Sequence, residues 1–127
     1  MMVLDASVLI AHLDADDAHH ERATRLLLDA IDEPLAASPL TLAEVLVGPA
    51  RGGRDELAEG ALRELGVEVV PLDVSAPRDL AELRARTQLR LPDCCVLLAA
   101  RSAGGYVATF DDRLHRAAAE LGLVRPD

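Results

Sequence analysis

MVLDAS, residues 2–7, is the stretch that decides the fold of this 127-residue chain. Residues 2–4 are apolar and have the character of a buried strand, whereas residues 7–13 have the spacing of a short helix. Asp5 lies at the junction between them. A strand that leads directly into a helix is the unit from which parallel sheets are built, and it leaves Asp5 just past the carboxyl end of its strand.

The same alternation of strand-like and helix-like runs continues along the rest of the chain. Strands are predicted at residues 2–4, 35–37, 67–71 and 106–109, and residues 123–125 are the candidate for a fifth, edge strand. Helices are predicted at residues 7–13, 19–31, 38–47, 54–65, 75–88, 93–103 and 112–121. Ser38 is expected to cap the third helix, and Gly48-Pro49 to stop it. This order predicts an α/β fold in one domain, residues 1–127, with a central, mostly parallel sheet of four to five strands and helices on both faces.

Composition limits the kind of core and the kind of partner. Only Tyr106 and Phe110 are aromatic, so the core must consist of Leu, Val, Ile and Ala, as in helix-covered parallel sheets. The formal net charge is -9, and all thirteen basic residues are Arg. Because phosphate contacts need cations, an acidic chain is a poor general binder of nucleic acid. Any nucleic-acid function must therefore use a local patch, a metal ion or a second chain.

The cysteines indicate the cellular compartment. Cys94 and Cys95 are adjacent, so they cannot join distant segments and do not have the spacing of a zinc site. Two buried thiols on an apolar helix are the expectation, and free thiols favour a reducing, cytoplasmic location. The apolar run at residues 1–10 is too short to span a membrane and contains Asp5, so no membrane association is expected.

Four carboxylates stand at separated places, each beside an apolar run: Asp5, Glu44, Asp93 and Asp111. The strand order can bring all four to one edge of the sheet, where ligands of such sheets bind. Two unit charges about 4 Å apart repel by about 4 kcal/mol at an effective dielectric constant of about 20. A fold that gathers several acids is therefore expected to bind a divalent metal ion there.

A capping role is the alternative explanation for three of these acids, because Asp commonly precedes a helix. Glu44 argues against it, since this residue lies inside a helix among Leu42, Ala43, Val45 and Leu46, where a charge needs a partner.

Three further polar residues lie beside the acids. The hydroxyls of Ser7 and Thr109 could orient carboxylates or hold a metal-bound water. Asp112 competes with Asp111, because one of the two could cap the last helix while the other faces the metal.

The motifs DAS at residues 5–7, LAEV at 42–45, LPD at 91–93 and ATFD at 108–111 together resemble those of a PIN domain. More narrowly, the chain resembles the VapC toxins of bacterial toxin–antitoxin pairs. The likeness extends over nearly the whole chain, with the motifs in order. It implies that Asp5, Glu44, Asp93 and Asp111 are the catalytic, metal-binding acids, and that Ser7 and Thr109, with Asp112 as the competitor for the fourth place, support them.

That resemblance implies an endoribonuclease that hydrolyses RNA phosphodiester bonds with Mg²⁺ or Mn²⁺. It also implies a cognate VapB-type antitoxin and a toxin homodimer. From the sequence itself, cations near the acids are the candidates for phosphate contacts: Arg84, Arg86, Arg90, Arg113 and Arg116. With so few aromatic residues, recognition is expected to rest on RNA shape and backbone.

Other functions fit less well. A receiver domain needs a Lys near its phosphoryl group, and the chain has none. Phosphatases of the haloacid dehalogenase type need a second Asp at position 7, which is Ser7, and a phosphate-binding P-loop motif is absent. The remaining alternatives are a degenerate PIN domain that binds RNA or protein without cutting, and a PIN relative that cuts DNA.

Overall fold

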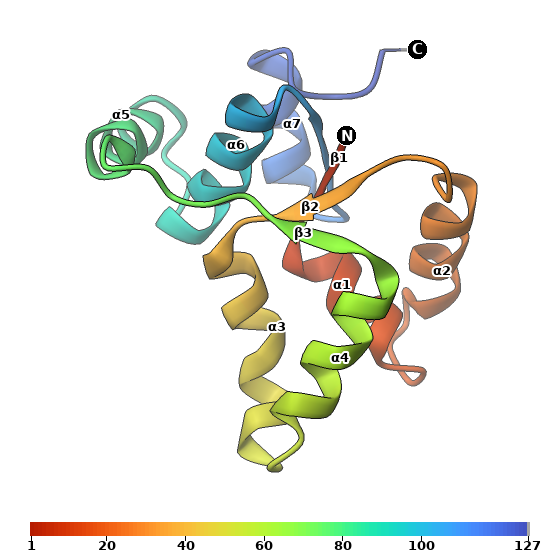
Figure 1. Ribbon diagram of the computed structural model, residues 1–127. Coiled ribbons are helices and arrows are strands. Elements are labelled where there is room, and N and C mark those ends of the chain that lie inside the picture. Colours follow the sequence, from red (N-terminus) through yellow and green to blue (C-terminus); the bar gives the residue numbers. More distant parts are fainter. Residues whose placement is uncertain (127) are drawn as a thin grey trace.

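Four short strands form the centre of the computed structural model, which describes residues 1–126 (Figure 1). They are β1 (Met2–Leu4), β2 (Leu35–Ala37), β3 (Val67–Val69) and β4 (Tyr106–Ala108). All neighbouring strands are parallel, in the order β3-β2-β1-β4. The predicted parallel sheet with its four main strands is therefore confirmed. Because all four strands run the same way, their carboxyl ends, followed by Asp5, Ser38 and Thr109, meet at one edge of the sheet.

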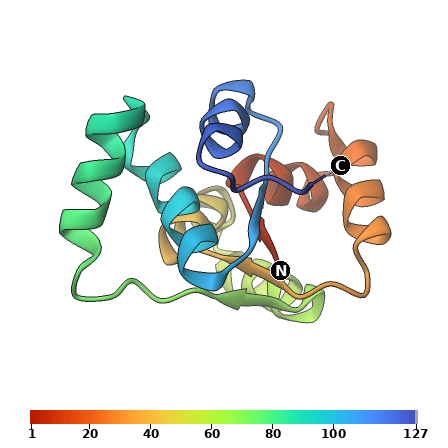
Figure 2. The same cartoon turned by 90° about the horizontal axis from the view of Figure 1, so that it is seen from above.

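Within residues 1–126, seven helices cover the sheet. They are α1 (Ala6–Leu13), α2 (His20–Asp29), α3 (Pro39–Arg51), α4 (Asp55–Leu65), α5 (Ala76–Thr87), α6 (Leu91–Ala103) and α7 (Asp112–Glu120). The core residues fall into two clusters, one with α5, α6 and α7 and the other with α1, α2, α3 and α4. Helices therefore pack on both faces of the sheet, as predicted and as Figure 2 shows from above.

Successive residues of β1 alternate between the two clusters. Val3 packs with the α5, α6 and α7 cluster, whereas Met2 and Leu4 pack with the other. This is the period of two that side chains follow along a strand. Because both faces of the strand are covered by helices, all three residues are apolar and buried.

The proposed fifth strand at residues 123–125 is wrong. The backbone N–H of Val107 donates to the carbonyl of Leu123 at 2.7 Å, so the C-terminal tail touches the free edge of β4 at this point. The tail then leaves the strand, because Arg125 turns to pair with Glu33 at 3.0 Å and Pro126 has no N–H to continue a ladder.

The predicted stop of the third helix at Gly48-Pro49 is also wrong, because α3 continues to Arg51. Pro49 lies in the last turn, where its missing N–H costs one helical bond and the helix is about to end anyway. The Pro49 carbonyl accepts from the N–H groups of Gly52 and Arg54, which closes the helix.

Gly105 lets β4 approach the beginning of the chain. A Cβ on Gly105 would collide with the carbonyl oxygen of Met1, the same oxygen that accepts from the N–H of Tyr106 at 3.0 Å. Because Gly105 has no side chain, the backbone of β4 can pair with the beginning of β1, the strand that ends at Asp5.

The two thiols lie on α6, as predicted. Cys94 and Cys95 are buried and free, and burial raises the pKa of both thiols above the usual value. Within residues 1–126, no helix combines the length and the apolar character needed to cross a membrane.

Candidate active site

Asp5 is the most deeply placed acid at the carboxyl edge of the sheet. Its side chain is 8 % exposed, and its backbone N–H donates to the carbonyl of Ala108 at 3.0 Å, next to the end of β4. Carboxylate atom Oδ2 accepts two hydrogen bonds, from Ser7 Oγ at 2.8 Å and from Thr109 Oγ1 at 2.7 Å. Although Asp5 occupies the N-cap position of α1, its side chain makes no capping bond. Helix capping therefore does not explain the position of this carboxylate.

Ser7 and Thr109 join Asp5 to the start of α7. Ser7 Oγ accepts from the N–H of Phe110 at 3.2 Å, and Thr109 Oγ1 accepts from the N–H of Asp111 at 3.0 Å. Each hydroxyl thus donates its proton to Asp5 and accepts from a backbone N–H of the loop after β4. Because both roles of the hydroxyl are occupied, the two bonds hold the Asp5 carboxylate in one orientation. The prediction that these hydroxyls orient a carboxylate agrees with this network.

Asp111 caps α7. Its Oδ1 accepts from the N–H of Leu114 at 3.0 Å, whereas Asp112 is exposed in the first helical turn. The suggestion that Asp112 caps and leaves Asp111 free is therefore wrong, because the residue that directly precedes the helix has the extended backbone a cap requires. Capping occupies one oxygen of Asp111, and its charge still reaches Asp93, whose pKa it helps to raise.

Asp93 lies in the first turn of α6 and is half-buried. The residue at the N-cap is Arg90, so capping does not explain Asp93 either. Partial burial, followed by the negative charges of Asp5 and Asp111, raises the pKa of Asp93 above its usual value. Asp93 is thus close to two of the other acids although it is distant from both in sequence.

Glu44 joins the cluster from α3. Partial desolvation, followed by the charges of Asp5 and Asp93, raises the pKa of its carboxyl group. Its apolar sequence neighbours do not enclose Glu44, because the side chain lies on the exposed face of α3 while Val45 points into the core. Asp93 is therefore within electrostatic reach of Asp5, Asp111 and Glu44, and Glu44 is also within reach of Asp5.

Two of the five candidate arginines belong to this site. Arg90 lowers the pKa of Glu44 and Asp93, and Arg113 lowers that of Asp93, so both guanidinium groups are near the acids. Arg84 instead donates to the carbonyl of Leu89 at 3.2 Å and closes the end of α5.

The other two arginines, Arg86 and Arg116, are exposed on α5 and α7. No hydrogen bond or ion pair within residues 1–126 connects either of them to the acids.

The donor chemistry of the site suits a hard divalent cation. Carboxylate and hydroxyl oxygens converge there, whereas both thiols are buried in α6. Among residues 1–126, no three His, Cys, Asp or Glu side chains close on a single point tightly enough to hold an ion by themselves.

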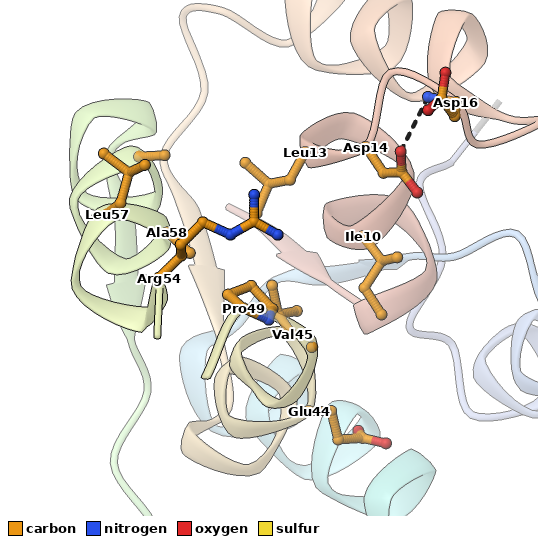
Figure 3. Close-up of a pocket in the computed structure, with 12 residues that line it drawn as sticks. Ile10, Leu13, Asp14, Asp16, Glu44, Val45, Pro49, Arg54, Leu57 and Ala58 are labelled. Atoms are coloured by element: carbon orange, nitrogen blue, oxygen red, sulfur yellow. Dashed lines mark hydrogen bonds between the residues drawn. The ribbon is translucent and has the colours of Figure 1, made fainter. Parts of the chain in front are cut away.

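A mostly apolar groove of about 720 Å³ begins at Glu44 and runs between α1, α3 and α4 (Figure 3). Ile10, Leu13 and Leu57 line it, and Leu57 is 75 % exposed. Glu44 lies at one end of the groove, and Asp14 and Asp16 lie near the other.

Comparison with known proteins identifies both a family and a set of similar structures. The sequence profile of the PIN domain family matches residues 2–120. VapC20 from Mycobacterium tuberculosis, described as a sarcin-ricin loop cleaving toxin, is similar in structure with a TM-score of 0.74 and 24 % identity over 99 % of this chain and 100 % of that one. A search of curated proteins found no match.

Two further structures resemble the chain. FitAcB from Neisseria gonorrhoeae gives a TM-score of 0.72 and 23 % identity over 94 % of each chain. A toxin–antitoxin complex from Klebsiella pneumoniae gives 0.70 and 22 % over 87 % of each chain. At such identities these likenesses establish a common fold.

Proposed function

This chain belongs to the PIN domain family, and on that premise we propose that it is an endoribonuclease that uses Mg²⁺ or Mn²⁺ and acts as the toxin of a toxin–antitoxin pair. The observation that carries the proposal is the convergence of Asp5, Glu44, Asp93 and Asp111 at the carboxyl edge of the sheet. After desolvation, the neighbouring acids raise the pKa of Glu44 and of Asp93, a cost that a cationic ligand or substrate complex would offset.

The site supports a hydrolytic reaction on a phosphodiester. When bound, a divalent ion supplies two things: a more acidic water and a positive charge beside the phosphate oxygens. Asp5 and Asp93 are the residues we assign to hold it, because they are the two more enclosed acids of the quartet. The hydroxyls of Ser7 and Thr109 keep Asp5 Oδ2 in one orientation.

Glu44 and Asp111 are the two exposed acids of the quartet, and both lie near Asp93, so we assign them to the attacking water. Asp111 is limited to one free carboxylate oxygen by its capping bond. Arg90 and Arg113 are positioned to contact the phosphate of the substrate, because they are the cations nearest to the acids.

Similarity to toxins of toxin–antitoxin complexes supports RNA as substrate and an antitoxin as partner. The groove between α1, α3 and α4 would receive an apolar segment of that antitoxin, with a basic residue placed against Glu44 or against Asp14 and Asp16. A homodimer, which follows from the same family relationship, and a cytoplasmic location, which the free thiols of Cys94 and Cys95 favour, complete the proposal.

The test compares RNA cleavage by the wild-type chain with that by Asp5→Asn and Asp112→Asn. Sequencing of 5′ ends from cells that express each variant reports the reaction and its target together. We expect discrete cuts with wild type and Asp112→Asn and none with Asp5→Asn, because Asn retains the shape and hydrogen-bond acceptor of Asp5 and removes its charge. Equal cutting by all three chains would refute the assignment of Asp5.

A non-cutting PIN domain that only binds RNA or protein is the alternative function. It predicts no affinity for Mn²⁺ at the acid cluster. Calorimetric titration of Mn²⁺ into wild type and Asp93→Asn separates the two functions, because the nuclease requires binding by wild type that is weakened by the substitution.

A further inference from the structure

A second groove, of about 590 Å³, lies on the other side of the acid cluster and is lined by cations. It runs between α2, β4 and the C-terminal tail, which all contribute residues to its lining. Its charged lining consists of Arg22, Arg25 and Arg125 against Asp29. With Glu33, which pairs with Arg125, three arginines against two carboxylates give this wall a net charge of +1 in a chain whose net charge is -9.

Two of these cations come from the acidic N-terminal part of the sequence. Residues 1–50 contain nine acids and only two basic residues, Arg22 and Arg25, and both line this groove. They are exposed one turn apart on α2. Neither has a carboxylate within salt-bridge distance among residues 1–126. Two guanidinium groups are thus available to a ligand in the most acidic part of the molecule.

Two of the arginines that line the groove lie over aromatic rings. The Arg22 guanidinium lies over the ring of Phe110, 4.3 Å from its centroid, and Phe110 directly precedes Asp111. Arg125 lies 5.4 Å from the centroid of Tyr106 and already donates to Glu33 at 3.0 Å. Stacking holds the Arg22 guanidinium in place and leaves its N–H groups free to donate.

The groove is continuous with the candidate active site. Thr109 belongs to its lining, and the same Thr109 hydroxyl donates to Asp5 Oδ2 at 2.7 Å. His115, one helical turn after the capping residue Asp111, lines the same wall. A strand whose phosphate is attacked beside Asp5 would therefore pass over Thr109 and enter this groove.

We propose that the groove of Arg22, Arg25 and Arg125 binds the sugar–phosphate backbone of the RNA strand next to the cleaved bond; this assignment rests on the proposed ribonuclease function. Backbone contacts from arginines fix the register of a strand and do not read its bases. The groove therefore positions RNA, and the apolar groove on the other side of Glu44 remains for the protein partner.

The test measures binding separately from cleavage. A 5′-fluorescein-labelled, single-stranded oligoribonucleotide is titrated with Asp5→Asn protein in Mg²⁺ buffer, and fluorescence anisotropy is followed at several salt concentrations. Adding Arg22→Gln and Arg25→Gln should weaken binding about tenfold or more. It should also reduce the slope of log K against log salt by about 1.4, since each lost contact to a single strand accounts for about 0.7.

A matched control removes two arginines elsewhere. Arg51→Gln with Arg101→Gln, in the same Asp5→Asn background, changes the net charge equally at the last turns of α3 and α6. The control should retain the parental slope. A third variant, Arg22→Lys with Arg25→Lys, should recover most of the affinity, because the charges remain.

Three outcomes would overturn the proposal: equal loss in the groove and control variants, no loss in either, or failure of the Lys variant to bind better than the Gln variant. Equal binding of a duplex DNA of the same length would overturn the assignment to RNA. Because binding is measured without cleavage, a wild-type chain that binds through these arginines and never cuts would contradict the proposed function and leave the groove assignment standing.

Discussion

Thr109 and Asp5 are 104 residues apart in the chain and are joined by a hydrogen bond of 2.7 Å from Thr109 Oγ1 to Asp5 Oδ2. The bond connects the ends of β4 and β1, two neighbouring strands of the sheet. Thr109 also accepts from the N–H of Asp111, so one hydroxyl sets the positions of two acids.

Replacing Thr109 tests this hydroxyl. Thr109→Val keeps the shape and removes both hydrogen bonds, so kcat should fall about 10- to 100-fold, the usual cost of losing a group that orients a metal ligand. Thr109→Ser should retain most of the activity. The measurement is RNA cleavage at saturating Mg²⁺ for the three proteins, and similar rates for Val and Ser would show that the hydroxyl does not act on Asp5.

Two substitutions of Asp111 distinguish its capping of α7 from its proposed part in cleavage. Asp111→Asn keeps a good N-cap, so the free energy of unfolding should change little while cleavage is lost. Asp111→Ala removes the cap as well and should lower the free energy of unfolding by about 1 kcal/mol. Urea unfolding and cleavage assays on both proteins check this, with Asp112→Asn as the variant expected to keep both properties.

The raised pKa values of Glu44 and Asp93 predict how stability depends on pH. An acid whose pKa is higher in the folded than in the unfolded protein favours folding while it is protonated. The contribution is complete below the unfolded pKa, which is 4.5 for Glu44 and 3.8 for Asp93. It is lost as pH rises through the folded pKa. At neutral pH without metal, both charges therefore oppose folding. Asp93→Asn should then raise the Tm at pH 7 by roughly 1–3 °C.

Scanning calorimetry at pH 3 and pH 7 checks the sign, because the gain should disappear below the unfolded pKa of 3.8. Added Mn²⁺ should raise the Tm of wild type at pH 7 and raise that of Asp93→Asn less. A variant that is less stable than wild type at pH 7 without metal would contradict the electrostatic account of the cluster.

Tyr106 offers a titration with one signal, because it is the only tyrosine and the chain has no Trp. Burial, followed by the hydrogen bond to Glu33 at 2.7 Å, raises the pKa of its phenol to about 12. Absorbance at alkaline pH should give a midpoint near that value, and Glu33→Gln should lower it. The phenol favours folding below pH 10 and loses this effect as pH rises to about 12.

Leu57 tests the apolar groove. Leu57→Asp places a charge where the antitoxin segment would pack, so it should abolish protection by the product of the neighbouring small open reading frame. Cleavage by the chain itself should persist, because Leu57 is distant from the catalytic chemistry proposed for Asp5. Co-expression growth assays report protection, and retained rescue by the partner would exclude this groove as its binding site.

The sequence predicted the parallel sheet and the placement of Asp5 and Asp111 past the ends of strands, because each follows a short apolar strand. It did not predict the exposure of Glu44. Apolar residues flank Glu44 in sequence, but on a helix the side chains at positions 44 and 45 point in different directions. Only the packing of α3 decides which of them faces the core.

The arginine groove was also beyond reach from the sequence. Arg22 and Arg25 are surrounded by acids along the chain, and Arg125 lies in a tail whose course depends on its pair with Glu33. The helical spacing of Arg22 and Arg25 was a usable signal, since it places both on one side of α2. Their proximity to Thr109 depends on how α2 packs against the sheet.

The contact between Val107 and Leu123 has a consequence for solubility. Outer strands of a sheet offer unpaired backbone groups that can recruit another molecule, and here the two outer strands are protected differently. The C-terminal tail occupies a donor of β4, whereas β3 carries the exposed charge of Glu68. Shortening the chain before Leu123 would uncover β4 and favour aggregation through that edge, so tags and truncations belong at some other place.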